Sequence, residues 1–267
     1  MTDLRPPVVA GMFYPAEAAI LRQEIDRYME AAQTPDLAPV RGVIVPHAGY
    51  VYSGPVAAYA YKLLAEQETR PDRIFVLGPS HRSWFPGVAI ADVDGFQTPL
   101  GVQPVDREYA GALASEERVF SAITAPHTPE HCLEVQIPFI QTILDAVPIV
   151  PMLFGEVDPI EVGKLLNGRL TPRDLLVISS DLSHYHSNEA AHRLDRGFID
   201  AVLAGNVEGV ASGEACGQSP IITLMTLAKS HHWQPHLLDY RTSGDITGDH
   251  SQVVGYAAIA YTDTRHG

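Results

Sequence analysis

The sequence contains few cysteines and no long apolar run. Two cysteines among 267 residues are too few for a disulfide framework, and they are typical of a protein from a reducing compartment. No stretch of about twenty apolar residues occurs, and the first residues lack the basic start and apolar run of a signal peptide. We therefore expect a soluble, cytoplasmic protein with no membrane association.

Basic residues are also scarce. Lys and Arg number 18 against 32 Asp and Glu, which gives a formal net charge of −14 at pH 7. A charge of this sign opposes binding to the phosphates of nucleic acid or to an anionic membrane surface. The composition therefore excludes nucleic acid as the main partner, and it indicates a solvated acidic surface.

The apolar content of 46% suffices for a real core, and short β-branched strands alternate with helices along the chain. This alternation predicts an α/β fold, a three-layer α/β/α sandwich around a central mixed, largely parallel sheet, in which the last two strands could be antiparallel. Without a repeat or a convincing linker, we expect one domain over residues 1–267. The predicted strands are 43–45, 73–77, 88–93, 148–154, 174–179, 237–241 and 253–261, and the main predicted helices are 17–32, 55–67, 107–114, 138–146, 159–170, 188–204 and 220–230.

Three of the strongest predicted strands are each followed by a chain-breaking turn and a histidine. These histidines are His47, His81 and His184. Ligands of open α/β sheets gather outside the carboxyl ends of the strands, so the three rings could meet in one crevice. One such histidine alone would more often be a hydrogen-bonded loop residue, but three in the same context favour a functional site.

Cys216 lies between glycines, immediately before a predicted helix that Ser219 can cap and Pro220 can open. A helix amino terminus lowers the pKa of a thiol, and a metal ion would lower it further. The alternative is that Cys216 is a small buried apolar residue, although the flanking glycines favour an exposed loop. Cys132 has apolar neighbours and is the weaker candidate.

Two imidazoles and a thiolate suit iron, copper or zinc better than magnesium or calcium, because nitrogen and sulfur donors match softer cations. The spacing of His47, His81 and Cys216 is not itself a metal motif. Asp181 could add an oxygen ligand or orient a histidine. His184 would then be free to act as a general base.

Three further residues are candidates for substrate contacts. His131 and Glu134 could line the mouth of a pocket, but an ion pair that stabilises their loop is an equal alternative. Tyr52 could stack on a ring-shaped ligand, although a tyrosine in a glycine-bounded turn more often packs on its own loop.

The sequence contains six ordered runs, VIVPHAGYVYSGP, VLGPSHR, EHCLEVQIPF, VISSDLSHY, EACGQSPI and GDHSQVVGYAA. Together they resemble the Memo family, whose bacterial and archaeal members are often called the B component of the AMMECR–Memo–radical-SAM system. The resemblance extends from Pro6 to Tyr261, and Memo proteins are similar in fold to the class III extradiol dioxygenases, non-heme Fe(II) enzymes with an α/β/α sandwich.

The resemblance implies that His47, His81 and Cys216 bind a metal, iron or copper, and that Asp181 and His184 complete the pocket. The dioxygenases have a glutamate as their third ligand, and here a cysteine occupies that place. A thiolate changes the charge at the metal and can itself be oxidised, which argues against ring cleavage of catechols.

Two classes of function follow as expectations. The first is a redox enzyme, an oxidoreductase or dioxygenase-like protein that holds Fe(II), or else copper, and acts on O2 or a small molecule. The second is a non-catalytic adaptor or metal carrier that works with AMMECR-like and radical-SAM proteins. Hydrolysis with zinc is a third and weaker expectation.

Overall fold

The structure is a computed structural model that describes residues 2–37, 39–144 and 146–264. Within these residues, nine strands form one mixed sheet. Eight of them follow the order β10-β12-β2-β9-β3-β8-β4-β7, and β11 pairs with β12 along residues 255–262. The bounds are β2 (Val40–Val45), β3 (Arg73–Pro79), β4 (Val88–Ile90), β7 (Phe120–Ala122), β8 (Ile149–Phe154), β9 (Asp174–Ser179), β10 (His184–His186), β11 (Gln234–Thr242) and β12 (Val253–Thr262).

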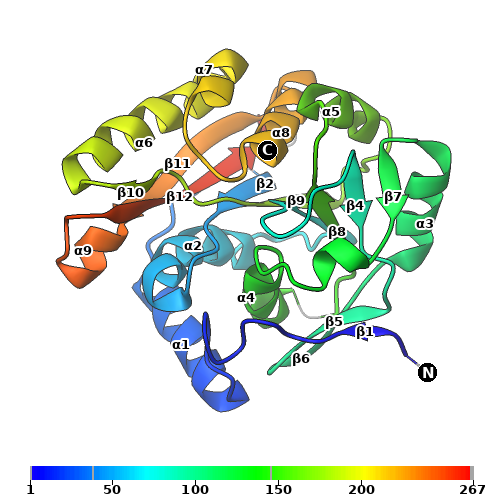
Figure 1. Ribbon diagram of the computed structural model, residues 1–267, viewed down its shortest axis with the longest axis horizontal. Coiled ribbons are helices and arrows are strands. Elements are labelled where there is room, and N and C mark those ends of the chain that lie inside the picture. Colours follow the sequence, from blue (N-terminus) through cyan, green and yellow to red (C-terminus); the bar gives the residue numbers. More distant parts are fainter. Residues whose placement is uncertain (1, 38, 145, 265–267) are drawn as a thin grey trace.

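Helices cover both faces of this sheet, which confirms the predicted three-layer sandwich (Figure 1). Side chains alternate between the faces of a strand, so Val43 and Val45 pack with the helices of one face, whereas Ile44 packs with those of the other. The first face carries α1 (Ala18–Ala31), α2 (Tyr50–Ala65) and α4 (Ile137–Ile143); the second carries α3 (Arg107–Glu116), α5 (Pro159–Asn167), α6 (Asn188–Leu203), α7 (Val207–Ser212) and α8 (Gln218–His231).

The parallel core of the sheet determines where the histidines lie. β2 and β3 both pair parallel with β9, and β3 also pairs parallel with β8. The carboxyl ends of β2, β3 and β9 therefore lie at one edge, where the chain continues into His47, His81 and Asp181 respectively. β11 and β12 are antiparallel, as the sequence suggested for the last two strands.

The segment 95–101, for which the sequence predicted neither a strand nor a helix, contains regular structure. Gly95–Thr98 (β5) and Gly101–Pro104 (β6) form an antiparallel hairpin, and Leu4–Arg5 (β1) adds to β5 as a parallel strand. Pairing with β1 comes from residues about ninety positions away, so no local pattern indicates it. This small sheet fixes the amino-terminal segment against the body of the molecule.

The start of α2 was also predicted wrongly. The helix begins at Tyr50 and contains Pro55, whereas the sequence placed its start at Pro55. The backbone N–H of Tyr50, one of the donors that lack a partner within the helix, donates to the Phe13 carbonyl at 2.7 Å. Tyr50 and Tyr52 therefore belong to the first helical turn rather than to a loop.

No helix in the described ranges combines the length and the hydropathy needed to cross a membrane.

Candidate metal centre

Three imidazole rings meet at the carboxyl edge of the parallel strands. One ring nitrogen of each of His47, His81 and His131 lies within 4.8 Å of a ring nitrogen of each of the other two. The ring centroids are 5.2 Å apart for His47 and His81, 5.5 Å for His47 and His131, and 4.9 Å for His81 and His131. His131, expected as a substrate contact, therefore lies inside the cluster itself.

Glu130 orients two of these rings. Its Oε1 accepts a hydrogen bond from Nδ1 of His81 at 2.9 Å and one from the backbone N–H of His131 at 2.9 Å, and it lies 3.0 Å from Nδ1 of His131. Its Oε2 accepts the backbone N–H of His81 at 2.6 Å. Because an ionised carboxylate only accepts, both rings carry their proton on Nδ1. In the neutral ring the lone pair is then on Nε2, the arrangement typical of metal-binding histidines.

The charge on Glu130 is secured by these same contacts. Burial alone would raise the pKa of Glu130, but hydrogen bonds from His131 and His81 outweigh burial and hold the pKa far below its ordinary value. The carboxylate therefore stays ionised at neutral pH and remains an acceptor for both rings.

Ser179 performs the same task for His47. The Ser179 hydroxyl donates its single hydrogen to the Cys132 carbonyl at 2.7 Å and accepts from Gln136 Nε2 at 2.8 Å. His47 Nδ1, 2.9 Å from that hydroxyl, must therefore donate to it. Nε2 is left with the lone pair, and it lies 3.4 Å from the sulfur of Cys216.

His47 is held in its neutral form. Burial lowers the pKa of His47 well below its ordinary value, and charge on His81 and His131 lowers it further. A neutral imidazole is the form that binds a metal ion.

Cys216 reaches the cluster beside His47. Its Sγ accepts the backbone N–H of Asp181 at 3.2 Å, and its own backbone N–H donates to the Asp181 carbonyl at 3.2 Å. A Cβ on Gly217 would lie 2.5 Å from Cβ of Ser180, so only glycine allows this approach. Burial, and then the charge of Asp181, raises the pKa of Cys216 to about 12, so the thiol is protonated at neutral pH unless a cation lies beside it.

Asp181 and His184 border the cluster. Asp181 Oδ1 accepts the backbone N–H of His47 at 2.7 Å. Burial raises the pKa of Asp181, and the hydrogen bond from the His47 backbone and the charges of His184, His131 and His81 oppose that shift. The backbone N–H of His184 donates to Glu214 at 3.1 Å, and the other Glu214 oxygen is 2.9 Å from His186 Nε2.

Glu134 lies away from the mouth of the site. Its buried carboxylate forms an ion pair with Arg5 and accepts the backbone N–H groups of Val8 and Val9 and the Tyr14 hydroxyl. Glu134 therefore pairs with Arg5 and not with His131, whose ring lies beside Glu130.

Tyr52 and Cys132 pack against their surroundings. Tyr52 is half-buried against the core in the first turn of α2. Cys132 is buried, its thiol donates to the Pro79 carbonyl at 3.1 Å, and its sulfur forms a second close group with His81 and Glu130.

Sequence reasoning missed the residues that orient the rings. Glu130 could have been suspected from its place beside His131 in the polar segment HTPEHCLEVQ, and Ser179 from its place at the end of β9. Gln136 gave no such signal, because a buried glutamine is recognised only from its partners. These are Ser179, the Pro46 carbonyl and the Tyr61 hydroxyl.

The donor set fits a transition-metal ion. Three imidazoles lie together, and the sulfur of Cys216 lies beside one of them, 3.4 Å from Nε2 of His47. Nitrogen and sulfur donors suit iron, copper or zinc rather than magnesium or calcium. The second group of donors, around Cys132, shares His81 and lies behind the rings, where the thiol is already bonded to a carbonyl.

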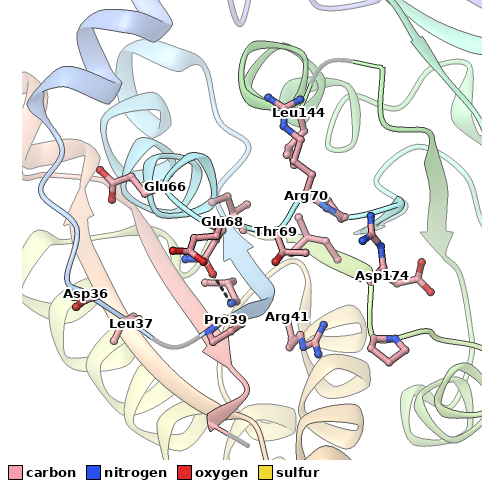
Figure 2. A pocket seen from close by; sticks show the side chains of 17 residues that line it. Asp36, Leu37, Pro39, Arg41, Glu66, Glu68, Thr69, Arg70, Leu144 and Asp174 are labelled. Carbon is pink, nitrogen blue, oxygen red and sulfur yellow. Dashed lines mark hydrogen bonds between the residues drawn. The ribbon is translucent and has the colours of Figure 1, made fainter. Parts of the chain in front are cut away.

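A separate cavity of about 740 Å³ lies at the opposite ends of the same strands (Figure 2). It opens beside the first residues of β2 and β9, and its charged lining largely cancels, since Arg41, Arg70 and Arg173 face four carboxylates. These are Asp36, Glu66, Glu68 and Asp174. The concentration of metal-binding groups at the other edge places the candidate site there.

Comparison with known proteins gives matches over almost the whole chain. A family model described as "Memo-like protein" matches residues 5–260. A MEMO1 family protein of Sulfurisphaera tokodaii is 35% identical, covering 97% of this chain and 100% of the relative, and one of Methanothermobacter thermautotrophicus is 36% identical, covering 96% and 100%.

Among solved structures, an uncharacterized Escherichia coli K12 protein, JW3007, has a TM-score of 0.52 with 10% sequence identity. The match covers 83% of this chain and 99% of that protein. At this identity the likeness concerns the fold alone.

Proposed function

The chain belongs to the Memo family, and from that premise we propose that it binds one transition-metal ion at its histidine cluster and uses it in a redox reaction. The observation that supports this proposal most is the common tautomer of the three rings. His81 donates from Nδ1 to Glu130, Nδ1 of His131 lies 3.0 Å from the same carboxylate oxygen, and His47 donates from Nδ1 to Ser179. His47 is buried, His131 is partly buried and His81 is exposed, and three rings that all offer Nε2 to one site are hard to explain by packing alone.

His47, His81 and His131 would hold the ion together with Cys216. Asp181, whose carboxylate accepts the backbone N–H of His47, would be a further oxygen donor. We favour Fe(II), then copper, over zinc. Iron or copper would supply one-electron chemistry toward O2 or a small organic molecule, and the sulfur would donate charge to the ion.

His184 is our choice for the proton-transfer residue. Its side chain is partly exposed beside the buried cluster, while its backbone is fixed by Glu214 and by pairing with Val254. A ring held in place by its backbone but open to solvent can exchange protons with a reactant and with water. The AMMECR-like and radical-SAM proteins stay proposed partners, on the strength of the family resemblance.

The test begins with protein purified without added metal or a chelating tag. After anaerobic loading with Fe(II) or Cu, we expect about one ion per chain and consumption of O2 when a reductant is present. His81→Ala should reduce metal binding by at least about tenfold, as expected for the loss of a ligand. His184→Ala should leave the metal content unchanged and slow O2 consumption by about 10²-fold or more.

His192→Ala is the matched control, because His192 lies on α6 against Tyr240 and outside the cluster. It should change neither binding nor turnover. Metal binding that survives His81→Ala together with Cys216→Ala would contradict the proposed site. Full binding without turnover would favour the adaptor or metal carrier, and turnover with zinc that is indifferent to O2 would favour hydrolysis.

A further inference from the structure

The amino-terminal segment Leu4–Tyr14, called here the strap, crosses directly behind the loop that carries Glu130 and His131. We propose that Arg5 in this strap is a positioning residue for the metal centre. It fixes the loop, and through the loop it fixes the directions of His81 and His131. This inference rests on the proposed function, and it adds a residue outside the metal centre that influences metal affinity.

The Arg5 guanidinium forms hydrogen bonds with residues at both ends of the loop and in its middle. Its Nε donates to the His127 carbonyl at 3.1 Å, one terminal nitrogen donates to the Glu130 carbonyl, and the other pairs with the Glu134 carboxylate. The guanidinium is buried and also lies over the ring of Phe96, 5.1 Å from its centroid. A planar fork of donors can hold three acceptors in fixed directions, which a lysine ammonium cannot do.

Glu134 fastens the loop to the rest of the strap. Its carboxylate accepts the N–H groups of Val8 at 2.9 Å and Val9 at 3.0 Å, and the hydroxyl of Tyr14 at 2.6 Å. Strap and loop are thus joined through a single buried network of charge-assisted hydrogen bonds.

The strap also contacts the cluster directly. The Phe13 ring packs edge-on against His131 with centroids 5.0 Å apart, and the Phe13 carbonyl accepts the backbone N–H of Tyr50 at 2.7 Å. Tyr50 begins α2, three residues after His47. The strap therefore spans from the His131 loop to the turn that carries His47.

The loop needs this external support. Between the short 3-10 helices Ala125–His127 and Glu134–Gln136 it has no regular structure, yet Glu130 must present one oxygen to two rings at once. A small displacement of Glu130 would turn both rings away from a shared ion. Loss of an outer hydrogen-bond partner typically lowers metal affinity by about 10–100-fold.

The test compares Arg5→Lys and Tyr14→Phe with the full-length wild-type chain, using Co(II) as the probe in competition with a chromophoric chelator. We expect Arg5→Lys to weaken Co(II) binding by about tenfold or more and to change its visible absorption spectrum. Tyr14→Phe removes one hydrogen bond and should weaken binding less, in the same direction. Thermal unfolding of each variant is measured in parallel.

Arg73→Lys is the matched control. Arg73 is also a largely buried arginine paired with two carboxylates, Asp106 at 3.0 Å and Asp174 at 3.2 Å, but it lies at the opposite end of the sheet. It should lower the unfolding temperature without changing Co(II) affinity. Equal affinity losses in Arg5→Lys and Arg73→Lys, or none in Arg5→Lys, would overturn the proposal.

A measurement without metal separates this inference from the proposed function. Ring nitrogen chemical shifts of His81 and His131 should report the Nδ1–H tautomer in the wild type and a mixture of tautomers in Arg5→Lys. If the wild type binds no Co(II) but the shifts change in this way, the metal proposal fails while the positioning role stands. Unchanged shifts in Arg5→Lys would remove the positioning role.

Discussion

Two chemically different acceptors set the same tautomer within the cluster. Glu130 is a charged acceptor for His81 and His131, whereas Ser179 is a neutral acceptor for His47. A carboxylate partner makes an imidazole a stronger electron donor than a hydroxyl partner does. His81 and His131 should therefore be the stronger ligands, and His47, beside Cys216, the weaker one.

Metal binding should release a proton from Cys216. Burial raises the pKa of this thiol to about 12 in the metal-free protein, so the thiol is protonated at pH 7.5. That pH is roughly one unit above the ordinary pKa of histidine, and burial lowers the pKa of His47 further, so His47 is already neutral. A sulfur ligand must lose its proton to bind. Calorimetric titration in buffers of different ionisation enthalpy should show about one proton released per ion.

Cys216→Ser should remove that proton release, and Cys132→Ser, which alters the cysteine packed against Pro79, should retain it. Equal proton release in wild type and Cys216→Ser would show that Cys216 is not a ligand.

His127 should make stability depend on pH. Burial, only partly offset by the hydrogen bond to the Ala89 carbonyl, lowers the pKa of His127 to about 3. Between pH 6.5 and 3 the unfolded chain binds a proton at this position and the folded chain does not. The free energy of unfolding should therefore fall as the pH drops through this window, by about 1.4 kcal/mol per pH unit from this group.

Urea unfolding of wild type and His127→Gln at several pH values measures this slope. The glutamine amide can still donate to the Ala89 carbonyl but does not titrate. The free energy of unfolding of His127→Gln should therefore fall with pH less steeply than that of the wild type, by about 1.4 kcal/mol per pH unit. Parallel slopes in the two proteins would contradict the assignment.

At the residue level, the sequence indicated the groups that could bind a metal better than the groups that orient them. His47, His81 and Cys216 stand out because each follows a strand end or lies between glycines. Glu130 and Ser179 do not stand out in this way, because an orienting role depends on which ring the fold brings within 3 Å, roughly one hydrogen bond.

At the scale of elements, the end of β3 is shaped by close approach to the loop that carries His131. A Cβ on Gly78 would lie 2.7 Å from the Cys132 sulfur and 2.8 Å from Cδ2 of Leu133. Glycine at this position therefore lets the loop lie against the strand.

Gly78→Ala should displace this loop, lowering the free energy of unfolding by about 1–3 kcal/mol and weakening metal binding. Gly111→Ala in α3 is the control, because nothing lies within 4 Å of its Cβ position; it should raise stability by roughly 0.5–1 kcal/mol. Denaturant unfolding and Co(II) titration check both variants. A Gly78→Ala protein with wild-type stability and affinity would contradict the close approach.

Where the sequence predicted a boundary of a helix or strand wrongly, the observed boundary depends on contacts with distant residues. α2 starts at Tyr50 because the carbonyls of Phe13 and Gly49 accept the backbone N–H groups of its first turn. Pro55 only resembles the start of a helix. β1 pairs with β5 across about ninety positions of the chain. Neither contact leaves a local trace in the sequence.

At the scale of the whole molecule, the layers were predictable and the strand order was not. Alternating apolar strands and amphipathic helices predict a sandwich from local patterns alone. The position of β12, the last strand, between β10 and β2 depends on pairing across most of the chain. That pairing brings β10, with His184, to the edge where β2 ends and His47 follows.

If imidazoles and the sulfur of Cys216 bind one ion together, X-ray absorption at the metal edge will detect both kinds of ligand. For protein loaded with Zn(II), we expect imidazole nitrogens at about 2.0–2.1 Å and one sulfur at about 2.3 Å. The sulfur should disappear in Cys216→Ser and persist in Cys132→Ser. A spectrum with oxygen neighbours only, or a sulfur signal unchanged in Cys216→Ser, would show that these residues do not share an ion.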